Sequence, residues 1–328
     1  MVHGSMFTRW VLSLVLTFAS AALTINADAA ISIKKMPYHN WSEAFTIGNG
    51  SSEVVVVAAI GRVMQFRWAG ETDGPFWENP RLHGKAPDSQ SLEWINFGGD
   101  KSWPAPQGDW EKSTGRGWPP PAAFDAVAVS AKVESESLIL QSPVDQHYGI
   151  EVERRIRLHK TEAELEIETI YHKKQGDPVR VAVWTITQLK DPELVVMPLP
   201  AKSIFPLGYN KQSEALPLDL KVENNRITCR RSPKLSTKIG SDAGQLIWVG
   251  PKTICEIYAP REEGEFPDNN SSAEIYTNPD PLDYVELELL GPLKMLKQGD
   301  KLSRKQIYRL HRRDSRPLDE QLSKIVRK

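Results

Sequence analysis

Alternating apolar and polar residues dominate the chain after about residue 50 and predict β-strands along most of its length. The run at 163–170, Ala-Glu-Leu-Glu-Ile-Glu-Thr-Ile, places mostly apolar side chains on one face and carboxylates on the other. This alternation is typical of a half-buried antiparallel strand, because successive side chains point to opposite faces. The carboxylates of this segment are therefore expected to face solvent and to take no part in chemistry.

Roughly fifteen segments fit a strand pattern and are separated by turn-rich stretches. They lie at 53–59, 63–68, 126–133, 137–141, 150–158, 163–171, 179–188, 193–197, 218–222, 226–230, 245–249, 253–258, 273–276, 284–290 and 305–310. A short helix is expected at 318–326, where Arg316-Pro317 precedes apolar residues at helical spacing. The pattern predicts an all-β fold of antiparallel strands with a short C-terminal helix. No fixed repeat and no low-complexity linker is visible, so a single domain is expected from residue 30 to residue 328.

One stretch, at about 72–123, departs from the strand pattern and is predicted to be a tryptophan-rich insertion. Long irregular segments inside compact domains are usually functional or disordered. Disorder is a poor fit here, because such a density of large aromatic rings is wrong for a segment that buries nothing. The tryptophans, counting one just before the insertion, are Trp68, Trp77, Trp94, Trp103, Trp110 and Trp118.

The N-terminal segment 1–29 has the features of a cleavable export signal. Arg9 provides a positive start, residues 10–25 form an apolar run, and Ala27-Asp28-Ala29 fits the small-residue cleavage pattern. A membrane anchor is the alternative, but a spanning helix needs about 20 apolar residues and this run is shorter. Cleavage is expected near Ala29, with a mature chain in the periplasm or outside the cell and no membrane span in it.

Charge, cysteine and histidine content narrow the function classes. The chain has 41 basic and 42 acidic residues, so it lacks the basic surplus that nucleic-acid binding requires, and no nucleic-acid partner is expected. Cys229 and Cys255 could form one disulfide in an oxidising compartment or remain as two buried thiols. The histidines show no metal-ligand spacing, so neither a metal nor a cofactor is predicted. His83 has the most reason to contact a ligand, because it lies in the insertion.

The segment 94–107 has the composition of a carbohydrate site. Sugars present apolar C–H faces together with hydroxyl groups, so their pockets combine aromatic platforms with a few fixed donors and acceptors. Paired glycines in this segment allow a ligand to approach the main chain closely. The alternative is that the tryptophans form a small core of their own that anchors the insertion. The residues expected to matter are Trp94, Asn96, Trp103 and an ion pair of Asp100 with Lys101.

At this point the sequence resembles a known family. Its order of motifs is similar to an exported bacterial family called domain of unknown function 4380 and, more loosely, to the galactose mutarotase-like superfamily. The resemblance extends from about Asn49 to Leu310. It rests on Asn49-Gly50, Glu53-Val54-Val55-Val56-Val57, Gly61-Arg62-Val63, Trp77-Glu78-Asn79, the run from Asn96 to Pro106, Val183-Trp184-Thr185-Ile186-Thr187-Gln188, the run from Tyr284 to Leu293, and Gln298-Gly299-Asp300.

The resemblance implies a β-supersandwich whose concave face holds a monosaccharide or the end of a glycan. Mutarotases open and close the sugar ring with a histidine acid and a glutamate base, because one oxygen must gain a proton while another loses one. The segment 181–188, which would carry the histidine, contains none. Glu286 and Glu288 share one face of their strand and are alternatives for the glutamate.

Two functions from different classes follow. The first is an exported carbohydrate-binding or carbohydrate-modifying protein with epimerase-like acid/base chemistry, in which Glu286 or Glu288 is the base and Asp100 or Lys101 assists. The second is a non-catalytic envelope protein that binds a protein partner through its tryptophan-rich segment, since exposed tryptophan and arginine are common at interfaces. For Arg62 a structural ion pair is the alternative to ligand contact. The expected catalytic residues are Glu286, Glu288 and Asp100, and the expected ligand-binding residues are Arg62, Trp77, Trp94, Asn96, Lys101, Trp103, Trp184 and Gln188.

Overall fold

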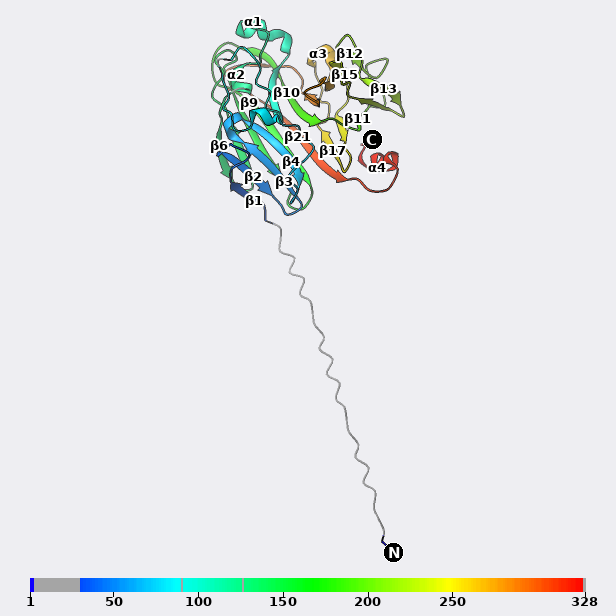
Figure 1. Cartoon of the computed structure of the whole chain (residues 1–328). Helices are drawn as coiled ribbons and strands as arrows, with labels where there is room; N and C mark the ends of the chain where they lie inside the picture. The colour runs from blue at the N-terminus through cyan, green and yellow to red at the C-terminus, as the bar shows by residue number, and fades with distance from the viewer. Residues whose placement is uncertain (3–29, 90, 126, 327–328) are drawn as a thin grey trace.

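Two antiparallel β-sheets pack against each other in the computed structural model (Figure 1), which describes residues 1–2, 30–89, 91–125 and 127–326. The expected signal peptide falls on residues that lie, apart from the first two, outside this description. The all-β prediction is confirmed, as is the short helix near the C-terminus.

The first sheet has 11 strands in the order β1-β2-β3-β4-β5-β10-β19-β18-β15-β12, with β20 beside β10. Each neighbouring pair is antiparallel, and β10 lies near the middle with β5 on one side and β19 on the other. The strands are β1 (Ser32–Lys35), β2 (Ala44–Gly48), β3 (Ser52–Val57), β4 (Arg62–Trp68), β5 (Asp100–Ala105), β10 (Val179–Lys190), β12 (Asn210–Lys211), β15 (Thr237–Ser241), β18 (Ala273–Thr277), β19 (Tyr284–Leu290) and β20 (Lys294–Leu296).

The second sheet has 10 strands in the order β13-β14-β11-β16-β17-β21-β9-β8-β7-β6. Its central strand β21 is long and pairs with β9 and β17. The strands are β6 (Ser130–Glu134), β7 (Ser137–Gln141), β8 (Ile150–Leu158), β9 (Glu164–Lys173), β11 (Leu194–Pro198), β13 (Leu218–Glu223), β14 (Arg226–Arg230), β16 (Gln245–Val249), β17 (Thr253–Tyr258) and β21 (Lys301–Arg312).

Helices are short and lie around the sheets. Helix α4 packs Leu322 and Ile325 on Val196, Ile247 and Ile254, which lie on the outer face of β11, β16 and β17. Within the described residues no helix is both long enough and apolar enough to cross a bilayer. The helices are η1 (Ala58–Ile60), η2 (Pro80–Leu82), η3 (Gln107–Asp109), α1 (Trp110–Thr114), α2 (Ala122–Asp125), α3 (Pro267–Asn270) and α4 (Leu318–Ile325).

The largest core cluster lies between the two sheets. Val54 and Leu287 from the first sheet meet Leu140, Ile167 and Tyr308 from the second, and all five are buried. Burial of one such large apolar side chain contributes about 1.5–3 kcal/mol, so this layer is the main force that holds the sheets together. Cys229 and Cys255 also lie in this cluster as free thiols. Of the two alternatives for these cysteines, the structure therefore has two buried thiols and not a disulfide.

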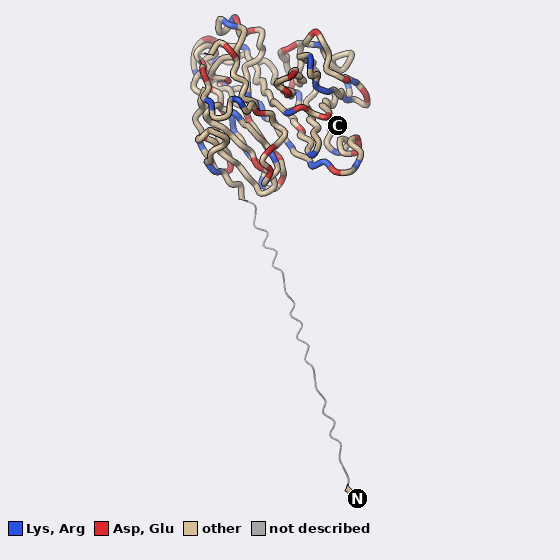
Figure 2. The backbone as a smooth tube through the Cα atoms, viewed as in Figure 1, with Lys and Arg blue, Asp and Glu red and all other residues tan. Residues whose placement is uncertain are grey.

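Basic and acidic positions are interspersed along the backbone of the described residues (Figure 2). On β9 the three carboxylates of Glu164, Glu166 and Glu168 are half-buried on the outer face, and Glu164 and Glu166 form ion pairs with basic residues. Their placement agrees with the expectation that these glutamates take no part in a site.

The insertion contains a strand that the sequence pattern did not predict. Strand β5 is buried along its whole length and pairs with β10 in the middle of the first sheet. Glycines before it and Pro104 within it are poor strand formers, so tertiary pairing overrides local preference here. Strand β4 pairs with β5 at a single position, Val63 with Asp100. The rest of that edge leaves room for Pro104, which has no N–H to donate.

Candidate functional site

Register across the central strands determines which side chains share a face. On β10, Ile186 pairs with Lys101 of β5 on one side and with Glu288 of β19 on the other. Since neighbouring residues of a strand point to opposite faces, Lys101, Trp103, Trp184, Glu286 and Glu288 all belong to the face turned away from the second sheet. This face carries the site.

A cavity of about 480 Å³ opens on this face of the first sheet. Its volume lies within the ordinary range for small-molecule sites. The walls combine indole and phenol rings with carboxylates, amides and one ammonium group. They are formed by Trp94, Asn96, Trp103, Gln107, Trp118, Trp184, Lys238, Tyr276, Asn278, Leu282, Tyr284, Glu286 and Glu288.

Trp103 is the centre of the aromatic wall. Its ring meets those of Trp94, Trp110, Trp118 and Trp184 edge to face, with centroids 5.4–5.8 Å apart. This geometry is favourable for aromatic pairs and fixes the rings relative to one another. The indoles therefore form a small core of their own, and four of them, Trp94, Trp103, Trp118 and Trp184, also line the cavity. Whether they bind a ligand stays a prediction.

Asp125 holds two of these rings in place through hydrogen bonds. Its carboxylate accepts hydrogen bonds from Trp94 Nε1 at 2.9 Å and from Trp103 Nε1 at 2.8 Å, and it also pairs with Arg62 at 2.5 Å. Trp184 Nε1 is likewise occupied, because it donates to Glu288 at 2.8 Å. With their N–H groups satisfied inside the protein, these rings have little freedom to turn and can present flat apolar faces to a ligand.

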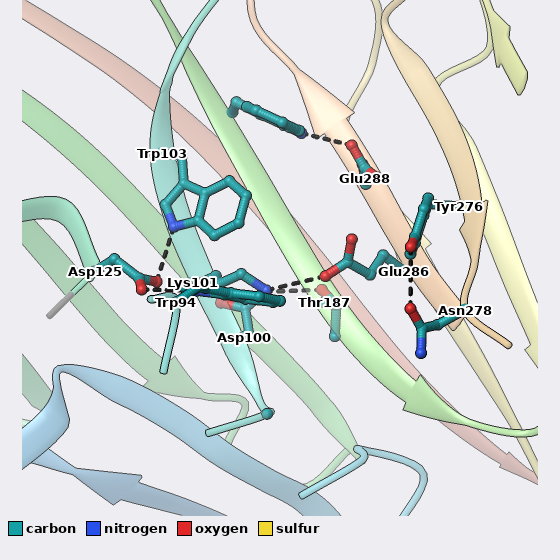
Figure 3. A network of polar contacts seen from close by, with 12 residues as sticks. Trp94, Asp100, Lys101, Trp103, Asp125, Thr187, Tyr276, Asn278, Glu286 and Glu288 are labelled. Carbon is teal, nitrogen blue, oxygen red and sulfur yellow. Dashed lines mark hydrogen bonds and ion pairs between the residues drawn. The ribbon is translucent and has the colours of Figure 1, made fainter. Parts of the chain in front are cut away.

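The first charged pair joins the insertion to β19. Lys101 Nζ lies 3.2 Å from Glu286 Oε1, and Lys101 is 2% exposed (Figure 3). The ammonium group also lies 5.3 Å from the Trp94 ring and 4.9 Å from the Trp103 ring. Both separations are favourable for a cation–π contact. Burial lowers the pKa of Lys101, and it raises the pKa of Glu286, which brings both toward the range of useful proton transfer.

The second charged group contains one cation between two carboxylates. Lys238 Nζ lies 2.7 Å from Glu274 and 3.0 Å from Glu288. Burial opposes the charge of Lys238, but the two carboxylates outweigh it and raise its pKa. Burial also raises the pKa of Glu274, with Lys238 opposing the rise. Lys238 therefore stays an ammonium group, and it holds Glu288 by an ion pair.

Asn96 supplies an amide with unused hydrogen-bonding capacity. It is 7% exposed, and within the described residues neither its Oδ1 nor its Nδ2 has a hydrogen-bond partner of good geometry, although the Tyr284 hydroxyl lies nearby. A buried amide without partners is costly unless something else satisfies it. On the wall of a cavity, a ligand hydroxyl can do so.

The expectation for Asp100 needs correction. Its carboxylate points between the sheets, where it pairs with Arg154 and accepts from Thr187 at 2.8 Å and Tyr308 at 2.6 Å. Neighbouring residues in a strand face opposite ways, so the expected ion pair of Asp100 with Lys101 is wrong. Asp100 is fully buried, does not line the cavity and is removed from the candidate catalytic residues.

Arg62 is also placed elsewhere. It is 1% exposed, pairs with Asp125 and donates to the carbonyl of Gly98 at 3.3 Å, so the structural alternative for this residue holds. The small cavity beside it, of about 30 Å³, has room for little more than one water molecule. Two further expected residues, Trp77 and Gln188, are buried beside the site without lining it, and Trp77 packs on Tyr284 with ring centroids 4.8 Å apart.

Several site residues were missed from the sequence. Lys238, Tyr276 and Asn278 come from β15, β18 and the turn after β18, and Asp125 comes from the end of α2. None of them lies in a local motif, since their meeting depends on strand pairing between distant segments. Trp118 lies in the insertion, and the high tryptophan content of the insertion was a signal for a site. The spacing of residues in the insertion did not show which of its tryptophans would line the cavity.

Comparison with known proteins shows the fold. No family model matches the sequence, and neither does any curated protein sequence. A candidate aldose 1-epimerase from Escherichia coli K12 has a TM-score of 0.52 and 13% identity over 86% of this chain and 99% of that chain. A candidate mutarotase from Salmonella typhimurium has a TM-score of 0.53 and 10% identity over 87% and 94%. A galactose mutarotase related enzyme from Lactobacillus acidophilus has a TM-score of 0.50 and 14% identity over 82% and 97%.

The chain thus has the galactose mutarotase-like fold, a large antiparallel β-supersandwich. At such low identity the likeness concerns the fold and does not transfer an activity. The narrower resemblance to the exported family stays a prediction, as do the catalytic and ligand-binding roles of the residues that line the cavity.

Proposed function

We propose that the chain binds a carbohydrate in the cavity on the open face of the first sheet and carries out acid/base chemistry at a sugar carbon there. The single observation that carries the proposal is the shared cavity of four indole rings with Glu286 and Glu288. The rings come from the insertion and from β10, whereas the carboxylates come from β19. Flat apolar faces beside fixed polar groups suit the two sides of a sugar ring.

Glu286 is the base in this proposal. It lines the cavity, and burial raises the pKa of its carboxyl group, which makes the carboxylate a stronger base than an exposed one. Lys101 Nζ lies 3.2 Å from the Glu286 carboxylate. It acts as a positioning residue that keeps this carboxylate ionised until the carboxylate accepts a proton from the sugar. Glu288 is less suited to proton transfer, because its carboxylate already forms an ion pair with Lys238 and accepts a hydrogen bond from Trp184.

Lys238 has the complementary role. It lines the cavity as an ammonium group, where it can hold an oxygen on which negative charge develops. A histidine acid, which the mutarotase resemblance implies, is not among the residues that line the cavity. In ring opening, Glu286 would accept the proton of the anomeric hydroxyl while the bond from the anomeric carbon to the ring oxygen breaks and its electron pair goes to that oxygen beside Lys238. The ring oxygen then takes a proton from solvent, and Glu286 releases the proton it accepted to solvent, so the open-chain sugar and the ring form contain the same atoms.

The test separates turnover from binding. Interconversion of α and β anomers is followed by NMR magnetisation exchange for a panel of monosaccharides, with the parent protein, Glu286→Gln and the matched control Glu168→Gln on the outer face of β9. Removal of a general base is expected to slow the catalysed exchange about 100-fold or more, and the control is expected to match the parent. Binding without faster exchange would remove the enzymatic part of the proposal, and the absence of binding to every sugar would remove all of it.

The protein-partner function has less support from the arrangement of the rings. Trp77, Trp103 and Trp110 are buried, and Trp118 is 44% exposed at the rim of the cavity. Rings that face inward contribute little area to a docking surface, since interface hot spots must first be accessible to the partner. We therefore keep the carbohydrate as the proposed partner of this surface.

The place of action is also a proposal. The apolar run at 10–25 and the small residues before residue 30 support export. An exported sugar-binding protein would meet glycans of the envelope or of the surroundings before they reach the cytoplasm.

A further inference from the structure

Three side chains with metal-binding groups meet at a second place in the molecule. His39 lies in the turn between β1 and β2, whereas Glu78 and His83 lie on either side of η2 in the insertion. One ligand atom from each lies within 4.8 Å of the other two. None of the three lines the sugar cavity, so the cluster is not part of the proposed function.

The distances fit a small tetrahedral ion. Glu78 Oε2 lies 3.5 Å from His39 Nε2 and 3.4 Å from His83 Nε2. Bonds of about 2.0–2.1 Å in a tetrahedral zinc site place neighbouring ligand atoms about 3.4 Å apart. Two of the three edges of the site therefore already have the length that a bound ion would require.

The Glu78 carboxylate is held in a ligand's orientation. Its Oε1 accepts hydrogen bonds from the Tyr38 hydroxyl at 2.5 Å and from Gln65 Nε2 at 2.6 Å. Its side chain is 9% exposed, and Oε2 is buried without a hydrogen-bond partner in the described residues. Metal ligands are commonly fixed in this way, with the second atom of the group bonded to the protein and the first left for the ion.

The two imidazoles are brought together by the fold. Their rings stack with centroids 3.7 Å apart and planes 10° apart, and Trp41 supports His83 edge to face at 5.7 Å. Because the nitrogen lone pairs lie in the ring planes, binding of one ion by both rings requires the 40% exposed His39 side chain to turn out of the stack. Gly84 has a positive φ, and a Cβ at this position would overlap the side chain of Asn40, so the glycine allows the two loops to approach.

We propose that His39, Glu78 and His83 bind one divalent transition-metal ion, for which Zn²⁺ is the best match. Imidazole nitrogens favour this class of metal over Mg²⁺ and Ca²⁺, which prefer sites made of oxygen alone. Three protein ligands leave the fourth position of the ion open to water or to an external ligand. The bound ion ties the turn between β1 and β2 to the insertion and stabilises the insertion against local opening.

Zinc binding is measured on the full chain, which is produced without a histidine tag and freed of bound metal with a chelator. Calorimetric titration with ZnCl₂ and metal analysis after dialysis are expected to give one Zn²⁺ per chain, and MgCl₂ is expected to give no binding. His39→Ala is the first variant, because this side chain is 40% exposed and its loss should leave the fold intact. Loss of a ligand should weaken the affinity at least as much as loss of a supporting residue does, about 10- to 100-fold. His147→Ala, which changes an exposed histidine on another loop, is the control and should bind as the parent does.

The melting temperature gives a second readout. Zn²⁺ should raise it in the parent and in His147→Ala but not in His39→Ala or Glu78→Gln, because a ligand stabilises the state that binds it. Glu78→Gln keeps the shape of the side chain and removes its charge, so it separates loss of the ligand from loss of the fold. The proposal is overturned if Zn²⁺ fails to bind at about 1 mM, or if His39→Ala binds it as tightly as His147→Ala.

Discussion

Lys101 and Glu286 form an ion pair of 3.2 Å across the intervening strand β10, although 185 residues separate them in the chain. The pair joins the tryptophan-rich insertion to β19 and places an aromatic wall and a carboxylate on one cavity. A buried ion pair adds little net stability after its desolvation cost, but loss of one partner is strongly unfavourable. Its value here lies in fixing the geometry of the site.

Trp118 should contribute to sugar binding more than to stability. It lines the cavity and is 44% exposed, so Trp118→Ala removes a stacking face but little core. Loss of an aromatic contact of about 1 kcal/mol predicts a fivefold to tenfold weaker sugar affinity, measured by calorimetry, with a nearly unchanged melting temperature. Trp68→Ala, at a half-buried ring near Arg312 and away from the cavity, is the control. Equal affinities of the two variants would show that Trp118 does not contact the ligand.

Stability should depend on pH through Glu274. Burial raises the pKa of this carboxyl group from 4.5 to about 8. Between these values the folded state binds the proton more tightly than the unfolded state does, so the contribution to stability is complete below about pH 4.5 and is lost as the pH rises to about 8. The free energy of unfolding, measured by urea denaturation across this range, should fall more steeply in the parent than in Glu274→Gln. A constant difference between the two proteins would contradict the assignment.

Asp100 should behave as a structural residue. Asp100→Asn leaves the buried guanidinium of Arg154 without its carboxylate partner. Loss of one member of a buried pair costs about 3–5 kcal/mol. Denaturation should show this loss, and the protein that remains folded should bind sugar as the parent does. Asp219→Asn, at an exposed carboxylate on β13, serves for comparison. A stable Asp100→Asn variant that has lost sugar binding would return Asp100 to the site.

The mature protein should begin near residue 30. Expression of the whole chain in a bacterial host with export machinery should yield a periplasmic or secreted product that starts at Ala30, as read by intact mass and N-terminal sequencing. Ala29→Arg should block this cleavage, since the cleavage site requires small residues. A full-length product in the cytoplasm would contradict the prediction of export.

Much of the fold was predictable because the strands carry their own pattern. Segments 150–158 and 284–290 largely alternate apolar and charged residues, and the observed strands have these same bounds. The face shared by Glu286 and Glu288 also followed from the period of two along a strand. These features depend on local sequence, so they can be predicted from one amino-acid sequence alone.

The site was less predictable because its members meet through long-range pairing. Strand β5 looks irregular in isolation and becomes regular only against β10, which then sends Asp100 and Lys101 to opposite faces. Lys238 and Asp125 have no local signal at all. Their roles arise from distant carboxylates and indoles that the sequence does not place beside them.

The indole N–H signals in the ¹H–¹⁵N spectrum test the central claim most directly. Titration with a sugar that binds should shift the signals of the cavity residues Trp94, Trp103, Trp118 and Trp184 together, with one affinity. Signals of Trp41 and Trp248, which lie in other clusters, should stay in place. Glu286→Gln should keep the same set of signals responsive, since the rings remain in position. Shifts confined to tryptophans outside the cavity, or no shifts with any sugar of the panel, would contradict the account.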